Sequence, residues 1–589
     1  MLKYIGKNVL TNGGIMKKIV SLLLSVVMIF GCLCVLSSCA SKDNGAKINI
    51  YLGNRVYDFD PSDYYVDSNA EQFLSLVYEP LFRIDEKGNL KNAAAKNYEV
   101  DEEKRVITIT LDETYWSDDK RVTASDYVYA WRRILDPDNV NGAAVLFNNV
   151  ENAMNAKNAK EGVSVFDVGF VASGTYEIKI TYVERADYNS ILTNLASIAT
   201  SPVREDMVTK YPGYWSKNIS TMAFNGPFKV TAVSEANGTV TLARNVGYHQ
   251  ALDEKNYTDE VLPGTVVGSF TVAGEQVPVT YGDLENKVVF YMGDASLADR
   301  KANKDNAIVA DTSSTYSYLF NTDNPLFANK DVRYALSIAI DREAIISAIT
   351  FGKAADGLVP DAFGGSSEAL LSTSANISKA NEILSSVEFT PDMKKTFTLS
   401  VDDNEQSRAI AEIVKTAWES LDAGFKVNVK YLAPITTVVG DITFTDSATQ
   451  VAVKNAGYGI REYDVLGIDL MAYSADGAVN TLALFTSNMH GCGANFADDD
   501  IRANLTGFSD AQYDRMVKRA GMAVTDSAKA KWLNLAEKYI IEQSPVVPLV
   551  FNQSFAFVND ELKNVEFDGL GHVVFTKAKL KNYEDYLED

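Results

Sequence analysis

Residues 116–133 read Trp-Ser-Asp-Asp-Lys-Arg-Val-Thr-Ala-Ser-Asp-Tyr-Val-Tyr-Ala-Trp-Arg-Arg, and this stretch contains the start signal of a helix. Thr123 is followed three residues later by Asp126, a variant of the capping box that begins helices. Pro137 ends the helix, because proline cannot continue it. The apolar residues at helical spacing are Tyr127, Ala130, Trp131, Ile134 and Leu135. The stretch therefore predicts a turn followed by an amphipathic helix, with Trp131 in a core.

Strand and helix patterns alternate along the rest of the chain. Apolar runs predict strands at 47–52, 106–111, 176–182, 316–321, 425–429 and 546–551, and a hairpin of 227–233 with 239–244 around Asn237-Gly238. Helical spacing predicts helices at 70–82, 330–350, 405–422 and 527–543, and one that Ser509 caps and that extends to about 522. The fold class is therefore α/β or mixed α+β.

Composition narrows the class of protein. The chain has 589 residues, of which 46% are apolar and 23% charged, as in ordinary globular proteins. At about 150 residues a domain, this length allows roughly three to four domains. The formal net charge of −23 excludes a nucleic-acid binder, because such proteins carry a basic footprint.

The first 38 residues differ from the rest of the chain. They hold four lysines and no acidic residue, so the chain without them carries a formal charge of −27. Lys17-Lys18 precede an apolar run at 19–30, which is the pattern of a signal peptide. Leu36-Ser37-Ser38-Cys39 resembles a bacterial lipobox, in which the cysteine is lipidated and becomes the first mature residue. We expect a signal peptide at 1–38, a lipidated tether at 39–46, and attachment to a membrane through Cys39.

Two alternatives stay open for this segment. Residues 19–36 are long enough to be considered a transmembrane helix, at the lower limit of spanning length. Met16 also makes a better start than Met1, because Met16-Lys17-Lys18 opens a compact basic region.

Sequence motifs for catalysis are missing. There is no G-x-G-x-x-G, P-loop, G-x-S-x-G or H-E-x-x-H pattern. The three histidines, His249, His490 and His572, leave little room for a His-built metal site or a Ser-His-Asp triad. Asp498-Asp499-Asp500 lacks the spacing of a calcium loop and is interpreted as a solvated turn. The sequence therefore favours a protein that performs no chemistry and needs no cofactor or metal.

Several motifs together resemble a single family. Besides 116–133 they are Tyr78–Phe82, Asn225–Val230, Leu319–Glu343, Tyr513-Asp514 and Pro545–Leu549. They cover about residues 47–583 in order, and they closely resemble the extracellular solute-binding proteins that serve oligopeptide and dipeptide ABC importers. The motif residues are expected to be structural, with Arg333, Asp341 and Arg342 in ion pairs.

The resemblance implies a bilobed, periplasmic-binding-protein-like fold with an inserted domain and a two-strand hinge. Lobe I would comprise residues 47–75, 200–320 and 545–589, domain II residues 76–199, and lobe III residues 325–540. The hinge would lie near Tyr318–Asn321 and Val547–Phe551. Closure of the lobes would bury the ligand and would give two discrete states, one of which an importer recognises.

The resemblance also implies where a ligand would be held. Members of the family bind peptides largely through backbone hydrogen bonds, and an aspartate pairs with the α-amino group of the peptide. The matching stretch here is Tyr473-Ser474-Ala475-Asp476-Gly477, which suggests Asp476 as the amine anchor and Tyr473 as an aromatic wall. The alternative is that Asp476 is a turn acid before Gly477. The loop after Asp60-Pro61 would add Tyr65, Val66 and Asp67.

The chain departs from the family pattern at three places. Gly477-Ala478-Val479 replaces the usual Tyr-x-Asp-Pro, and Ala143 stands where an aromatic residue is expected. Residues 256–310 fit the pattern poorly. These departures leave the ligand's length, and even its being a peptide, open.

The resemblance implies a non-enzymatic receptor. It would be a monomer, lipid-anchored at the outer face of the cytoplasmic membrane, that captures peptides and delivers them to ABC transporter permease subunits without cofactor or nucleic acid. One alternative is a surface receptor that senses peptides. Another keeps the fold and binds a sugar, a nickel chelate or another small solute. A secreted hydrolase is disfavoured, because nucleophile motifs are missing.

Overall fold

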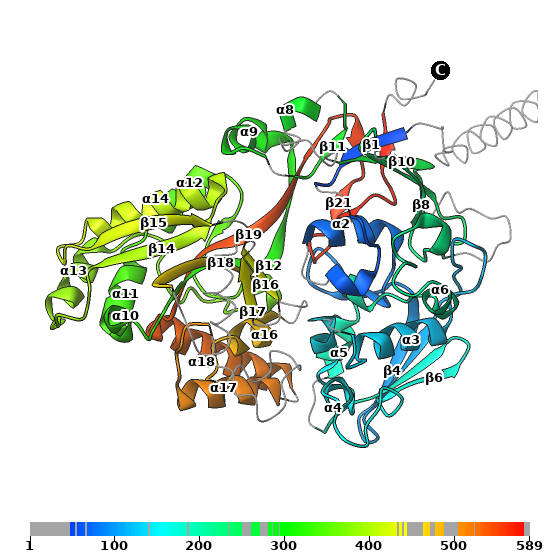
Figure 1. Cartoon of the computed structure of the whole chain (residues 1–589), viewed down its shortest axis with the longest axis horizontal. Helices are drawn as coiled ribbons and strands as arrows, with labels where there is room; N and C mark the ends of the chain where they lie inside the picture. The colour runs from blue at the N-terminus through cyan, green and yellow to red at the C-terminus, as the bar shows by residue number, and fades with distance from the viewer. Residues whose placement is uncertain are drawn as a thin grey trace, which may run out of the picture.

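Two bodies joined by two long strands make up the protein (Figure 1). The structure is a computed structural model that describes residues 47–53, 56–64, 68–139, 142–184, 188–234, 236–249, 261–270, 281–284, 287–293, 295–432, 435–438, 441–444, 463–471, 477–487, 505–523 and 525–581. The joining strands are β12 (Ala307–Phe320) and β19 (Val546–Val558). The expected bilobed α/β fold with a two-strand hinge is confirmed.

One mixed sheet passes through both bodies. Its strands lie in the order β15-β14-β18-β12-β19-β11-β1-β10-β9-β8, and β13 also pairs with β19. The bounds not yet given are β15 (Lys426–Leu432), β14 (Thr396–Asp402), β18 (Val465–Met471), β11 (Phe290–Tyr291), β1 (Lys47–Tyr51), β10 (Thr265–Ser269), β9 (Thr239–Arg244), β8 (Phe228–Ser234) and β13 (Lys353–Ala354). The hinge strands occupy the middle of this order, so both bodies are built onto the same two strands.

The hinge strands are longer than the sequence predicts. The predictions were 316–321 and 546–551, whereas β12 has 14 residues and β19 has 13. The polar runs 311–315 and 552–554 interrupt the apolar pattern that marks a strand. Both predicted segments therefore cover only the apolar part of each strand.

The helix predicted from residues 116–133 is confirmed as α3 (Ala124–Ile134). The Asp126 carboxylate accepts from the backbone N–H of Thr123 at 2.8 Å, which completes the capping box. Trp131 is fully buried and donates its indole N–H to the Thr200 carbonyl at 2.8 Å. The helix packs on a four-stranded antiparallel sheet made of β4 (Ala95–Asp101), β5 (Val106–Leu111), β7 (Glu177–Thr181) and β6 (Phe170–Gly174).

Glu79 and Asn225 belong to two separate family motifs, and the side chain of Asn225 binds the backbone of Glu79. The Asn225 amide accepts from the Glu79 N–H at 3.1 Å and donates to the Glu79 carbonyl at 2.8 Å. The buried Glu79 carboxylate contacts Tyr248 at 2.5 Å, Arg83 at 3.0 Å and His249 at 2.6 Å. Burial opposes the charge on His249, but the charge of Glu79 outweighs it and raises the pKa of His249 to about 10. These motif residues therefore stabilise the fold.

The predicted helix 330–350 is two helices. They are α11 (Lys330–Ile338) and α12 (Arg342–Ile349). The Asp341 carboxylate accepts from the Ala344 N–H at 3.0 Å, so it caps α12 and interrupts the run. The apolar spacing continues across this cap, which is why the sequence pattern shows one helix.

The expected ion pairs of Arg333, Asp341 and Arg342 are wrong. Arg342 is fully buried and donates to the carbonyls of Pro548 at 2.8 Å and Ser337 at 3.2 Å. Arg333 donates to the Phe327 carbonyl at 2.6 Å and to that of Gln543 at 2.7 Å. Neither arginine pairs with a carboxylate among the described residues. Both satisfy backbone carbonyls instead, which lie near helix ends except for that of Pro548 in β19.

The remaining elements follow the predicted alternation with small changes at their ends. α17 (Ala511–Gly521) begins after Asp510, whose carboxylate accepts from the N–H groups of Gln512 and Tyr513, so the predicted cap at Ser509 is wrong.

The other helices are η1 (Pro61–Tyr64), α2 (Ser68–Val77), η2 (Gly142–Phe147), α4 (Ala153–Lys157), α5 (Tyr188–Asn194), η3 (Ile198–Thr200), α6 (Glu205–Lys210), η4 (Ile219–Thr221), α8 (Tyr281–Leu284), α9 (Leu297–Asn303), η5 (Lys304–Asn306), α10 (Pro325–Ala328), η6 (Asp361–Phe363), α13 (Ile377–Ser385), α14 (Glu405–Glu419), α16 (Gly477–Ala483) and α18 (Asp526–Gln543). The short strands are β2 (Phe82–Ile84), β3 (Leu90–Asn92), β16 (Ile435–Val438), β17 (Asp441–Phe444), β20 (Leu562–Lys563), β21 (Glu566–Phe567), β22 (Val573–Val574) and β23 (Lys579–Leu580). In the part of the chain that the structure describes, no helix is long and apolar enough to cross a membrane.

The apolar core differs between the two bodies. One continuous cluster joins Ile50 of β1, Leu242 of β9 and Trp131 of α3, so the expected domain II shares its core with lobe I. The expected lobe III has two clusters, one around Trp418 of α14 and one around Leu533 of α18. Alternate residues of β12 and β18 enter the two clusters, which therefore lie on opposite faces of the sheet. The domain boundaries themselves stay a prediction.

Candidate functional site

The ladder between the hinge strands opens where they pass from one body to the other. Regular pairing stops at Asp311 and resumes at Thr315. Within the opening, the Thr312 hydroxyl donates to the Asn552 carbonyl at 2.9 Å. We name the polar side chains at this crossing the hinge cluster, which consists of Asp311, Thr312, Ser314, Asp469, Asn552 and Gln553.

Asp469 lies in the hinge cluster on β18, which pairs with β12. Its carboxylate accepts from the Asn552 amide at 2.5 Å, and the same amide donates to Ser314 at 2.9 Å. The Asp469 side chain is exposed to solvent, although the strands beside it remove part of its hydration. Burial raises its pKa, against the hydrogen bonds from Asn552 and Ser314. An exposed carboxylate of this kind can be reached by a ligand from solvent.

Asp311 and Asp469 differ in their partners. Asp311 pairs with Lys353 at 2.5 Å and accepts from the Gln553 amide at 2.9 Å. The Gln553 oxygen accepts from the Gly352 N–H at 3.0 Å, which ties the start of β13 to the hinge. No cation lies within ion-pair distance of Asp469 among the described residues. Asp469 is therefore the acid of the cluster that can receive a cation from a ligand.

A pocket of about 400 Å³ borders the hinge and is lined by both bodies. Its walls are residues 308–311 of β12, the segment 84–88, the segment 565–569, and Ala362 with Phe363. Gly88 has a φ of +79°, and a Cβ there would be 3.6 Å from the Ala362 carbonyl oxygen. This volume lies in the range of pockets for small ligands.

The loop 357–366, which carries Phe363 into this pocket, is held by one buried carboxylate. Glu537 accepts from the N–H groups of Leu358 at 2.8 Å, Val359 at 2.9 Å and Ser366 at 2.9 Å. Burial raises the pKa of Glu537, and the three N–H groups oppose this rise. A Cβ at Gly365 would be 2.0 Å from the Val359 carbonyl oxygen, so the loop requires glycine there. The wall of the pocket is therefore rigidly positioned.

The predicted site residues Tyr65, Val66, Asp67, Tyr473 and Asp476 lie outside the described residues, and so does Cys39. The structure does describe what flanks 473–476 in the chain. β18 ends at Met471, which pairs with Ser314 of the hinge cluster. Ala478, at the start of α16, has its Cβ 3.3 Å from where a Cβ on Gly364 would be. The residues on either side of the predicted anchor therefore lie beside the hinge cluster and the loop 357–366.

Sequence reasoning missed Asp469 and the hinge cluster. The signal was an acid inside the otherwise apolar run Val465–Met471, and polar runs inside both hinge strands. A charged residue in a central strand needs a reason, because burying it without a partner is unfavourable.

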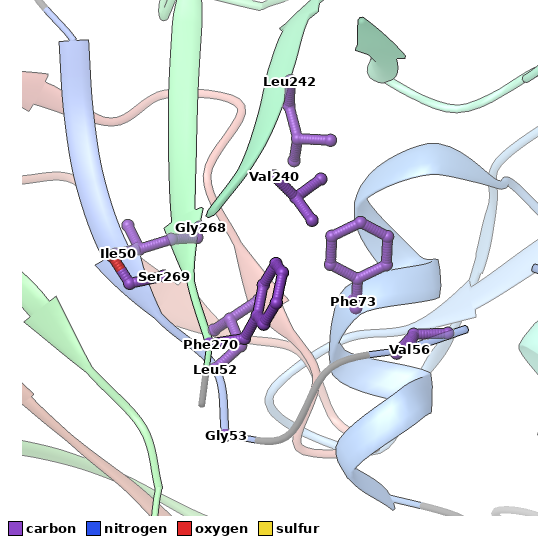
Figure 2. A pocket seen from close by; sticks show the side chains of 10 residues that line it. All are labelled: Ile50, Leu52, Gly53, Val56, Phe73, Val240, Leu242, Gly268, Ser269 and Phe270. Carbon is purple, nitrogen blue, oxygen red and sulfur yellow. The ribbon is translucent and has the colours of Figure 1, made fainter. Parts of the chain in front are cut away.

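A second hollow, in the first body, is too small to be a ligand site. Figure 2 shows that it lies between α2 and the strands β1, β9 and β10. Its walls are apolar and include Ile50, Phe73, Val240 and Phe270, and its volume is about 20 Å³. Such a space holds about one water molecule. No cluster of His, Cys, Asp or Glu that could hold a metal ion occurs in the described part of the chain.

The family model, the related sequences and the similar structures all indicate the same family of proteins. The family described as bacterial extracellular solute-binding proteins, family 5 Middle, matches residues 89–465. The dipeptide-binding protein DppE of Bacillus subtilis is 23% identical over 546 residues, which are 90% of this chain and 92% of that protein. The structure of the Escherichia coli murein tripeptide binding protein MppA has a TM-score of 0.69 and 21% identity, and covers 92% of this chain and 99% of that one. The pheromone receptor PrgZ has a TM-score of 0.68 and 21% identity, and covers 91% and 99%. The chain therefore belongs to the bacterial extracellular solute-binding proteins of family 5, which are binding receptors and not enzymes.

Proposed function

We propose that this protein binds peptides between its two bodies and delivers them to the permease subunits of an ABC importer. The observation that carries the proposal is Asp469, a water-accessible carboxylate that has no cationic partner among the described residues, beside the opening in the hinge ladder. A peptide offers an α-ammonium group for such a carboxylate and a backbone for hydrogen bonding. Similarity to a dipeptide-binding and a murein tripeptide binding protein supports a peptide as ligand.

Asp476 is the proposed anchor of the α-amino group, with Tyr473 as an aromatic wall. Residues 471 and 478, on either side of this segment, lie against the hinge cluster and the loop 357–366. Asp469 adds negative potential at the same crossing, which favours a cationic group there. Tyr65, Val66 and Asp67 would line the opposite wall. An ion pair enclosed by closed lobes is stronger than an exposed one.

We also propose that Cys39 carries the lipid that holds the protein at the outer face of the cytoplasmic membrane. The lipobox-like stretch before Cys39 supports this assignment. Metabolic labelling with a fatty-acid analogue should label the wild type, whereas Cys39→Ala should be unlabelled and released into the medium. Equal labelling of both would contradict it.

The anchor is tested with Asp476→Asn and matched peptides. Calorimetry should show free-amine peptides binding about tenfold more weakly to the variant, whereas their N-acetylated forms bind both proteins alike. Asp305→Asn removes the same charge at an exposed position and serves as the control. Equal losses for free and acetylated peptides would refute the anchor role.

A peptide-sensing receptor is the second candidate. It is favoured by the similarity to PrgZ, a pheromone receptor that binds peptide. Uptake of labelled peptide by a deletion strain separates the two functions, because an importer's receptor is required for uptake and a sensor is not. A sugar or nickel chelate as ligand would appear as a failure of all peptides to bind.

A further inference from the structure

A separate pocket of about 590 Å³ lies on the expected domain II, beside α3. Helix α3 lies away from the hinge strands, at the other end of the first body (Figure 1). The lining of the pocket combines apolar side chains, two arginines and two acids. Arg133 is already satisfied, because it pairs with Asp60 and stacks on Trp215 at 5.6 Å. The chemistry of the pocket therefore depends on Arg132.

Arg132 is a cation whose hydrogen-bonding capacity the protein leaves unused. One terminal nitrogen donates to the Phe170 carbonyl at 3.0 Å. Its Nε is inaccessible to solvent and has no hydrogen-bond partner, and no carboxylate lies within ion-pair distance, among the described residues. Burial lowers its pKa. A guanidinium in this state gains from an anionic ligand, and its planar fork suits a carboxylate.

Phe166 stands beside Arg132 in an ordered but exposed position. Its ring is 75% exposed and lies 5.2 Å below the Arg132 guanidinium. The turn that carries it is held by Asp167, which accepts from both the N–H and the hydroxyl of Ser164 at 2.9 and 2.7 Å. Val171, 52% exposed, lies in the same pocket. An aromatic side chain that is exposed and yet preorganised is typical of a contact surface.

We propose that this pocket binds a small zwitterion with an apolar side chain, of the class of a free hydrophobic amino acid. Arg132 receives the carboxylate, and Phe166 and Val171 receive the apolar group. Asp136 and Glu205, which also line the pocket, face the ammonium group. The site is independent of the hinge cluster and of peptide binding there.

The test uses the full chain and L-phenylalanine as the probe, with saturation-transfer NMR and calorimetry. Phenylacetate lacks the amine and should bind more weakly, and phenethylamine lacks the carboxylate and should not bind. Arg132→Gln should weaken L-phenylalanine binding about tenfold. Phe166→Ser, at an exposed position that folding does not need, should weaken it about fivefold.

Matched controls separate this site from the cleft. Arg121→Gln and Tyr214→Ser change an exposed arginine and an exposed aromatic residue outside the pocket and should leave binding unchanged. Asp476→Asn should also leave it unchanged. The proposal is overturned if L-phenylalanine does not bind, if phenethylamine binds equally well, if Arg132→Gln and Phe166→Ser match their controls, or if Asp476→Asn abolishes binding.

Discussion

The two faces of the hinge strand β19 have opposite chemistry. Phe555 stacks on Phe351 at 4.3 Å, and Phe557 lies parallel to Tyr291 at 6.2 Å. We call this side the aromatic face. Residues of the other parity, Asn552 and Ser554, form the polar face, where Asn552 binds Asp469, whereas Gln553 of the hinge cluster has the parity of the aromatic face.

The aromatic face contacts both bodies, because Tyr291 belongs to β11 and Phe351 follows α12. Arg300 of α9 covers Phe555 at 5.0 Å and reaches Gln406 of α14 at 2.6 Å. The polar face instead binds the solvent-exposed carboxylate of Asp469 on β18 through Asn552. The two faces of β19 therefore have different roles. One face packs against both bodies, and the other leaves hydrogen-bonding groups for a ligand.

The largest effect is expected on the aromatic face. Phe557→Ala should lower the free energy of unfolding by about 3 kcal/mol, because it removes a buried ring and leaves a cavity. Peptide affinity of the folded protein should stay within about twofold. Urea unfolding and calorimetry measure the two quantities, with the exposed Leu535→Ala as the control for stability. A loss of affinity without a loss of stability would reverse the assignment of the faces.

A smaller and opposite effect is expected at the hinge cluster. Asp469→Asn should weaken binding of free-amine peptides about fivefold to tenfold, because the negative charge at the crossing is lost. Stability should not fall, because the amide keeps the shape and removes a charge that partial desolvation disfavours. Asp305→Asn is the charge-matched control. Unchanged affinity would show that the polar face does not contact the ligand's charge.

The stability difference between wild type and Asp469→Asn should depend on pH. Because the folded state raises the pKa of Asp469, it holds this proton more tightly than the unfolded chain does. The negative charge of Asp469 therefore destabilises the folded state increasingly as pH rises from the unfolded-state pKa through the folded-state pKa. Relative to wild type, Asp469→Asn should gain stability between pH 4 and pH 7. Thermal unfolding at both pH values checks this, and a constant difference would contradict the raised pKa of Asp469.

The smallest effect is expected at Ser554. Ser554→Ala removes one hydroxyl from the polar face and should change the free energy of unfolding by no more than about 0.5 kcal/mol. Urea unfolding of Ser554→Ala and Phe557→Ala under the same conditions compares the two losses of stability. A loss as large as that of Phe557→Ala would show that both faces hold the hinge.

The sequence predicted the structure correctly where interactions between residues close in the chain determine it. The capping box of α3, the burial of Trp131 and the hairpin of β8 with β9 follow from spacing and turn residues. The split at Asp341 and the carbonyl partners of Arg333 and Arg342 did not, because they depend on contacts with distant segments. Asp469 was missed because its neighbours from β12 and β19 are more than 80 residues away in the chain. The proposed anchors Tyr473 and Asp476 stay predictions.

Native mass spectrometry of the purified protein tests the central claim most directly, because it weighs what the cleft retains. We expect peptide masses on the wild type that are lost on mild denaturation, and a lower occupied fraction in Asp476→Asn and Asp469→Asn than in Asp305→Asn. A retained sugar or metal chelate, or equal peptide occupancy in all three variants, would contradict it.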